Sequence, residues 1–414
     1  MLLVNKLFWP LLASLLILGC EVDTEEEKIE VGQKAKEAIE AFPFSDPNKY
    51  CINLIAENIG WESKTPCQVQ LSHGDQFSAE YSGLVKFRGG SSSKFNKHSF
   101  TLHTLEECPI LSQAINSSQD FVLNASYIDK TLIRHALSYL TFNMMDEKNK
   151  APNCQFYELY LNGNYQGAYV AMEKVNEAFC GINTSDSTAA LLKDGGLFRT
   201  GYFVPQEPGN YYHLKFPDID SVDRSDIPAA FKQWIDFPVF FKADQDEMID
   251  IQNIIDWHIL LLVSNNDDGV LKNFYWYKAD STQPWRVIPW DYDHSFGRDG
   301  DGTLNIDDRM VKCERNKLLN TLLNDDEYKA KLAHRYFELK NNFVISKEAL
   351  NFNISELQFE LTPLMEKNAA MWSHSDTTFY PDTNGFDKEI EIMRTFIDRR
   401  IDELDILMNQ WAII

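Results

Sequence analysis

The stretch that decides the fold is residues 257–297, WHILLLVSNNDDGVLKNFYWYKADSTQPWRVIPWDYDHSFG. An apolar run of helical character leads into an acidic cluster, and two alternating segments, FYWYK and WRVIPW, then lead to Asp291 and Asp293. This pattern predicts a buried helix followed by a pair of strands with carboxylates at both edges. Ionised side chains are seldom left beside a hydrophobic core unless they are paired or bind a cation, because their desolvation is costly.

The spacing of these carboxylates is more informative than their charge. Asn273 follows Asp268 after four intervening residues, and Asp291 comes one strand later, with a glycine shortly beyond. Protein kinases place a catalytic-loop Asp, an Asn and a metal-binding Asp in this order, so that one carboxylate orients the substrate hydroxyl while the other two residues hold magnesium. Asp and Asn are also frequent in turns, so a hairpin with solvated acidic turns stays open as the alternative.

The first twenty residues have the pattern of an export signal. Lys6 precedes the apolar stretch LFWPLLASLLIL, which is shorter than the roughly 20 residues of a transmembrane helix. Ile17-Leu18-Gly19-Cys20 resembles a bacterial lipoprotein box, in which the cysteine is lipidated. We expect a signal peptide over residues 1–20, a lipid anchor at Cys20 in the cell envelope, facing the periplasm or exterior, and an acidic tether over 21–45. An ordinary secretory peptide with an incidental cysteine is the alternative.

Six further cysteines stand at positions 51, 67, 108, 154, 180 and 313. In an exported chain this even number allows up to three disulfides, with buried thiols as the alternative. The chain has 414 residues, enough for one large domain or two fused domains, and its formal net charge is −23. Such an acidic balance argues against nucleic-acid binding and against electrostatic adhesion to anionic lipid.

Two hairpins and a helix are predicted in the first half of the chain. SAEYSGLVKFRGGSSSKFNKHSFTLH, residues 78–103, predicts strands on both sides of a polar tip. In that tip Arg88, Gly89 and Ser92 have the groups to bind phosphates, although an exposed tip without a ligand is the simpler interpretation. FYELYLNGNYQGAYVAMEKV, residues 156–175, predicts a second hairpin with a tight turn at Asn162-Gly163. A helix between them, over about residues 129–145, is expected to pack on the sheet.

The chain beyond residue 304 has the pattern of amphipathic helices, over about residues 318–342, 354–372 and 387–411. Arg394, Arg399 and Arg400 are expected to be charges on a helix face and not ligands. The histidines His258 and His334 are interpreted in the same way, as structural residues. His294 adjoins Asp293, but a solvated loop histidine is the simpler expectation.

These motifs, in this order, resemble the CotH family, spore-coat-type proteins with an atypical protein-kinase fold. RGGSSSKFNKHSF is similar to the family's Arg-Gly-x-Ser-Ser stretch with its lysine, and YLNGNYQGAYVAMEKV to its Asn-Gly-x-Tyr-x-Gly-x-Tyr hairpin. GGLFRTGYF is similar to the next strand, with Arg199 where a lysine is common. NNDDGVLKNFYWY, IPWDYDHSFG and EIMRTFIDRRIDELDILM resemble the two acidic motifs and the terminal helix, so the resemblance covers about residues 84–408.

The resemblance implies an α+β, atypical protein-kinase-like fold. It would have an N-terminal, mainly antiparallel β lobe with a helix and a C-terminal, mainly helical lobe. We expect one kinase-like domain over residues 46–414, divided near residue 200 into an N-lobe (46–200) and a C-lobe (201–414).

The resemblance also implies roles for individual residues. Asp268 would be the catalytic acid, Asn273 and Asp291 magnesium ligands, and Asp293 a second ligand or an orienting group. The loop that contains Arg88, Gly89 and Ser92 would cover the phosphates. The remaining nucleotide contacts would come from Lys97 with Glu173 as its partner, from the aromatic pair Tyr169 and Trp290 around the adenine, and from Arg199. In isolation, Glu173 is as easily explained as a solvated carboxylate.

The function that the resemblance implies is transfer of the ATP γ-phosphoryl group, with magnesium or manganese, to Ser or Thr of a surface or envelope protein. Two other functions stay open. The same ATP and metal site also suits AMP transfer or glutamate ligation onto a protein. A non-catalytic surface adhesion module would have no use for a metal triad.

Overall fold

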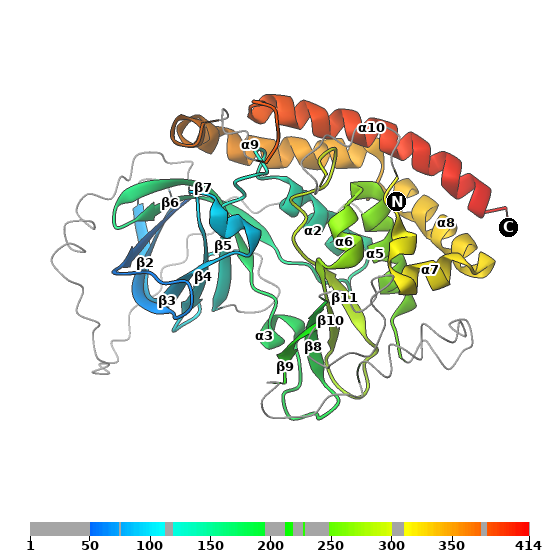
Figure 1. Ribbon diagram of the computed structural model, residues 1–414, viewed down its shortest axis with the longest axis horizontal. Helices are drawn as coiled ribbons and strands as arrows, with labels where there is room; N and C mark the ends of the chain where they lie inside the picture. Colours follow the sequence, from blue (N-terminus) through cyan, green and yellow to red (C-terminus); the bar gives the residue numbers. More distant parts are fainter. Residues whose placement is uncertain are drawn as a thin grey trace.

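The computed structural model describes residues 50–73, 76–111, 119–194, 212–217, 227, 248–299, 310–373 and 379–413. These residues form a mixed α+β structure, in which a closed seven-stranded barrel stands beside a four-stranded sheet and a group of helices (Figure 1). The predicted α+β class is therefore confirmed. The expected signal peptide, acidic tether and lipidation site Cys20 lie outside the described residues, as does Arg199.

The barrel is built from the first part of the chain. It contains β1 (Tyr50–Ala56), β2 (Thr65–His73), β3 (Gln76–Arg88), β4 (Ser99–Thr104), β5 (Asp120–Asn124), β6 (Cys154–Leu161) and β7 (Asn164–Glu173). Neighbouring strands follow the order β1-β2-β3-β4-β5-β7-β6, and a parallel pairing of β1 with β6 closes the ring. Closure leaves no exposed strand edge, and alternate residues such as Leu54, Val69 and Leu102 fill the interior.

Both predicted hairpins are present in the barrel. β3 and β4 are joined by the polar tip, which contains a 3-10 turn, η1 (Ser91–Lys94). β6 and β7 are joined by Asn162 and Gly163, whose φ angles of 50° and 75° are those of a type I′ turn.

The second sheet holds the two strands that flank the acidic motifs. It contains β8 (Ala190–Asp194), β9 (Tyr212–Phe216), β10 (Phe274–Lys278) and β11 (Arg286–Pro289), in the order β11-β10-β8-β9. The alternation of FYWYK and WRVIPW predicted β10 and β11 correctly. β8 pairs with β10 so that Lys193 lies opposite Tyr275. This pairing brings a lysine from a distant part of the sequence to the carboxylate end of the hairpin.

The helices are α2 (Arg134–Met145), α3 (Glu177–Cys180), α5 (Ile251–Ser264), α6 (Asp267–Leu271), α7 (Lys317–Leu323), α8 (Asp326–Asn341), α9 (Lys347–Met371) and α10 (Phe386–Trp411), with a 3-10 turn, η2 (Cys313–Arg315). α9 and α10 pack against each other along one side of the molecule (Figure 1). Among the described helices, none combines the length and hydropathy that a membrane crossing requires.

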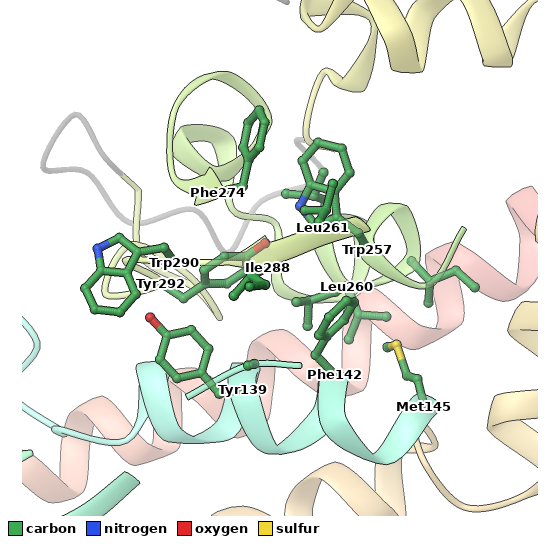
Figure 2. Close-up of a cluster of buried hydrophobic side chains, with 14 of the residues drawn as sticks. Tyr139, Phe142, Met145, Trp257, Leu260, Leu261, Phe274, Ile288, Trp290 and Tyr292 are labelled. Atoms are coloured by element: carbon green, nitrogen blue, oxygen red, sulfur yellow. The ribbon is translucent and has the colours of Figure 1, made fainter. Parts of the chain in front are cut away.

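α2 was expected to lie on one face of the sheet, but it is enclosed more completely than that. It packs against α5 and α9, and its apolar residues share one cluster with Val170 and Met172 of the barrel. Nine of its twelve residues are buried. Figure 2 shows Tyr139 and Phe142 of α2 facing Leu260 of α5 and the segment that follows β11. A helix enclosed in this way is fixed relative to the acidic motifs.

The six cysteines remain thiols in the structure, contrary to the expectation of up to three disulfides. The strand register explains why the first two do not join. Cys67 of β2 lies opposite Ala56, whereas Cys51 of β1 lies opposite Ser72. Five residues of strand separate the two, or about 17 Å, well beyond the ~7 Å that a disulfide spans between Cα atoms.

Candidate active site

The centre of the site is the turn that follows β11. Asp291 has a φ of 63°, the left-handed conformation that a residue with a side chain adopts only when its surroundings hold it there. Two side chains one turn apart on α2 supply that support. The backbone N–H of Asp291 donates to the Tyr139 hydroxyl (2.9 Å), and the N–H of Tyr292 donates to His135 Nδ1 (3.0 Å). Figure 2 shows the Tyr139 hydroxyl directed toward this segment.

The acidic motif that comes first in the chain is positioned by the end of α5. The residue that follows this helix, Asn265, adopts a left-handed conformation, and Asn266 then caps α6 by accepting the N–H of Gly269 (2.8 Å). A Cβ at Gly269 would lie 2.9 Å from the end of the Leu261 side chain, so α6 approaches α5 closely at this glycine. A tight turn after α6 leads to Asn273, and both Asn273 and Asp268 of α6 lie beside the Asp291 turn.

Asn273 connects the two motifs directly. Its Nδ2 donates to the backbone carbonyl of Asp291 (3.3 Å), and its own carbonyl accepts the N–H of Trp290 (3.0 Å). The Oδ1 atom of the same amide is then the atom suited to bind a cation. Asp268 forms an ion pair with Lys272 (3.0 Å), and its side chain is 27% exposed, accessible from solvent.

Asp291, Asp293 and His135 form a compact group. One ligand atom from each lies within 4.8 Å of the other two. Both ring nitrogens of His135 already have partners in the protein: Nδ1 accepts the N–H of Tyr292 (3.0 Å), and Nε2 lies 3.2 Å from Nδ2 of Asn124. The two aspartates are therefore the metal-binding candidates, and His135 is a neighbour that fixes their surroundings.

The electrostatics of this group favour a cation. Burial, together with the carboxylate of Asp291, raises the pKa of Asp293 to about 8. Two carboxylates held together at low exposure repel each other, and a divalent cation removes that repulsion. Carboxylate and amide oxygens are also the hard ligands that magnesium prefers, so Asp291, Asp293 and Asn273 suit this ion.

A cationic and aromatic surface adjoins the carboxylates. The Arg88 guanidinium lies over the ring of Trp290, 5.4 Å from its centroid, and the ring edge of Tyr275 meets the same indole at 5.7 Å. Lys193 extends over Tyr275 at 5.9 Å. Burial lowers the pKa of Lys193, and the nearby Asp291 carboxylate opposes that shift. Two cations thus stand next to the metal candidates, as a site for phosphate groups requires.

The hairpin tip next to Arg88 is exposed. Gly89 has a φ of 138°, and a Cβ there would overlap the Ser92 hydroxyl, so this tight turn needs glycine. Gly89 and Ser92 are both exposed, and their polar groups are accessible to a ligand.

Three predicted nucleotide residues lie elsewhere. Lys97 is buried, and its ammonium group donates to the carbonyl oxygens of Ala125 (2.8 Å) and Ala168 (2.6 Å). The Tyr169 ring is buried inside the barrel, in a different cluster from Trp290. Glu173 is buried beside Asn153, from which it accepts two hydrogen bonds. These hydrogen bonds hold Lys97 and Glu173 against the barrel and its connecting segments, and not against the Asp291 turn.

His294 was expected to be solvated, but it is enclosed. Its ring stacks on Phe379 with centroids 5.0 Å apart, and Nδ1 lies 3.1 Å from the Tyr380 hydroxyl. Burial lowers the pKa of His294. The side chain therefore fixes the segment after Asp293 against the chain that precedes α10.

Sequence reasoning missed four residues that the structure brings to the site: His135 and Tyr139 of α2, Arg134 at its start, and Lys193 of β8. In the sequence, the first three belong to a helix recognised by its apolar spacing. The one available signal was their polarity within such a segment, because buried polar groups need partners. For Lys193 the signal was a lysine at the end of an apolar run, ALLK.

The chain is similar to a known protein family. The model of the family described as CotH kinase protein matches residues 85–404. The inner spore coat protein H of Bacillus subtilis (strain 168) is 22% identical over 263 residues, which cover 59% of this chain and 67% of that protein. The solved structure of the Helicobacter pylori proinflammatory kinase CtkA is similar over 86% of this chain and 94% of its own, at 10% identity and a TM-score of 0.33. Since the family model spans most of the chain, the protein belongs to the CotH kinase family.

Proposed function

We propose that the protein is an ATP-dependent protein kinase that transfers the γ-phosphoryl group to Ser or Thr of another protein. One observation carries the proposal: Asn273, Asp291 and Asp293 converge at the end of β11, with Asp268 open to solvent on the adjoining helix. Arg88 and Lys193 stand beside the same group. Phosphoryl transfer requires this combination of positioned anionic ligands, cations and an accessible carboxylate.

Each group has a separate task in this mechanism. Magnesium, bound by Asp291, Asp293 and the Oδ1 of Asn273, would neutralise phosphate oxygens. Arg88 and Lys193 bind the phosphate chain from the side of the aromatic surface, where Trp290 is the candidate for contact with the adenine. The Gly89 and Ser92 turn lies next to Arg88, where it covers the phosphates.

Asp268 is assigned to the acceptor. Its carboxylate orients the hydroxyl group and accepts its proton as the new oxygen–phosphorus bond forms and the bond from the γ-phosphorus to the bridging oxygen of ADP breaks. Lys272, 3.0 Å away, keeps this carboxylate in place. The accessible position of Asp268 suits a protein side chain as the acceptor.

The location of the protein is part of the same proposal. The N-terminal sequence supports export and a lipid anchor at Cys20, which would hold the kinase domain at the envelope through the acidic tether. The acceptor would then be a surface or envelope protein. The acidic charge of the chain, −23, favours acceptors with basic surfaces.

Intact-mass spectrometry tests the proposal. The purified protein is incubated with ATP, magnesium or manganese, and casein as a generic acceptor. We expect a gain of one or more phosphate masses on casein or on the protein itself, and no gain in Asp291→Asn. An adenylyl-sized gain, or a glutamyl gain when glutamate is supplied, would replace phosphoryl transfer by the corresponding modification. If no mass is gained and no nucleotide binds, the function that remains is the non-catalytic surface adhesion module.

A further inference from the structure

A cavity lies where the C-terminal part of α9 meets the barrel. Its volume is about 40 Å³, it is partly open to solvent, and its walls include Lys97, Ser126, Tyr127, Asp129, Lys130 and Trp372. α9 is held to β7 there, since Asn368 accepts the N–H of Ala168 (3.0 Å) and Trp372 donates to the carbonyl of Gln166 (2.8 Å). The cavity wall is thus fixed on both sides.

The hydroxyl group of Ser126 makes no hydrogen bond in the described chain that would explain its place in the cavity wall. The residue is 6% exposed, and its Oγ has no hydrogen-bond partner among the described residues. Its φ is 43°, a left-handed conformation held by the hydrogen bond from its N–H to Asn124 (2.8 Å). A buried hydroxyl without a partner destabilises the fold, and so does a strained backbone. An unpaired buried hydroxyl and a strained backbone are both expected at a binding site, where a ligand supplies the missing hydrogen-bond partner.

The charges around the cavity favour an anion. The ammonium of Lys97 is buried, and no described carboxylate lies within ion-pairing distance of it. Lys130 adds a second positive charge, and its ammonium group forms an ion pair with the partly exposed Asp382 (3.7 Å). Among the described residues of the wall, Asp129 is the one acidic side chain, and it forms a buried ion pair with Arg134. Burial lowers the pKa of Lys97 to about 7, so below that pH the described wall carries two positive charges beside one carboxylate that is already paired.

The cavity is separate from the cations assigned to the nucleotide. Neither Arg88 nor Lys193 lines it, and neither does Trp290. Asp129 of the cavity wall is close enough to Asp293 for its charge to raise the pKa of that carboxyl. The cavity therefore adjoins the metal-binding candidates from another side. A group bound in the cavity would lie close to the reacting centre without occupying the nucleotide site.

We propose that this cavity is a second oxyanion site, which binds a phosphoryl group through the Ser126 hydroxyl and the Lys130 ammonium, in the field of Lys97. A phosphoryl group offers several acceptor oxygens in different directions, and hydrogen bonds from charged or hydroxyl donors to such oxygens are strong. The ligand is either free phosphate or a phosphorylated side chain of an acceptor protein. The proposal concerns binding and stands independently of the transfer reaction.

The test is calorimetric titration of the full chain with inorganic phosphate, without divalent cations and at constant ionic strength. We expect saturable binding that is weakened roughly tenfold in Ser126→Ala and roughly tenfold in Lys130→Met. Lys174→Met is the matched control, since Lys174 also pairs with a carboxylate, Asp120 (3.6 Å), but does not line the cavity. It should bind phosphate like the wild type.

Ser126→Ala provides a second readout. It removes a hydroxyl without a partner, so its thermal midpoint should equal or exceed that of the wild type while its phosphate affinity falls. A lower midpoint with unchanged affinity would assign Ser126 a structural role and overturn the site. Absence of saturable binding, or an equal loss in Lys174→Met, would also overturn it.

Two competition arms identify the ligand. Phosphate binding should persist when the nucleotide site is saturated with ATP, and displacement by ATP would show that there is no second site. A phosphoserine peptide that displaces phosphate, while its unphosphorylated form does not, identifies an acceptor already phosphorylated nearby. If neither peptide displaces it, the ligand is free phosphate.

Discussion

Replacing Tyr139 by phenylalanine tests whether α2 supports the metal site. The substitution removes one oxygen atom, which accepts the backbone N–H of Asp291 at 2.9 Å from within the core. A buried N–H that loses its partner destabilises a protein by roughly 1–3 kcal/mol. Asp291 is already in a left-handed conformation, so the loss should let the turn relax and move the carboxylate. Changes to such supporting groups typically reduce metal affinity by about 10–100-fold.

The control is Tyr336→Phe. Tyr336 is also fully buried, and its hydroxyl bonds to Asp405 (2.9 Å) between α8 and α10, away from the acidic motifs. Urea unfolding measures stability, and calorimetry with a non-hydrolysable ATP analogue, with and without magnesium, measures metal-dependent binding. We expect both variants to lose stability and Tyr139→Phe alone to lose metal-dependent affinity. Equal affinities in the two variants would refute the role assigned to α2.

Four further outcomes are expected. Asp291→Asn should abolish magnesium-dependent turnover while the circular dichroism spectrum stays unchanged; retained turnover would remove Asp291 from the metal site. Lys193→Met should weaken ATP more than adenosine, by roughly tenfold in an equilibrium binding assay, because one cation next to the phosphates is lost. Trp290→Leu should weaken adenosine and ATP alike, by roughly 1–3 kcal/mol, and an unchanged adenosine affinity would place the adenine elsewhere. Burial lowers the pKa of His258 to about 3 in the folded protein, whereas the unfolded chain keeps the ordinary value of about 6.5. As the pH falls below about 6.5, the unfolded chain therefore binds a proton at His258 before the folded protein does. Stability should therefore fall by up to ~1.4 kcal/mol per pH unit from this residue, and His258→Phe should lack that part of the slope in acid unfolding curves.

The local part of the site was predictable from sequence, because local chemistry determines it. The alternation around FYWYK and WRVIPW fixes two strands, and a strand pair brings its flanking residues together. Asp268, Asn273 and Asp291 are therefore close whatever the rest of the chain does. The same reasoning holds for the tip at Gly89, where neighbouring residues determine both the hairpin and its tight turn.

The supporting part was not predictable, because its partners are far apart in sequence. Tyr139 and Asp291 are separated by 152 positions, and His135 and Tyr292 by 157. The apolar spacing of α2 predicts a buried face without saying what that face touches. The surroundings of the two candidate lysines were not predictable for the same reason. Lys97 has the motif, but the closed barrel directs its ammonium to backbone carbonyls, whereas the pairing of β8 with β10 brings Lys193 toward Asp291.

Buried ions around α2 join the terminal helix α10 to the acidic motif. Arg134 bonds to Asp129 before α2, to the carbonyl of Ser295 beyond the acidic motif, and to Glu389 in the first turn of α10. Arg298 bonds to the same Glu389. Removing one member of a buried ion group leaves the others uncompensated, at a cost of roughly 3–5 kcal/mol. A chain that stops before α10 would leave both arginines without Glu389, so the terminal helix is part of the support that holds the Asp291 turn, and the match through residue 404 includes it.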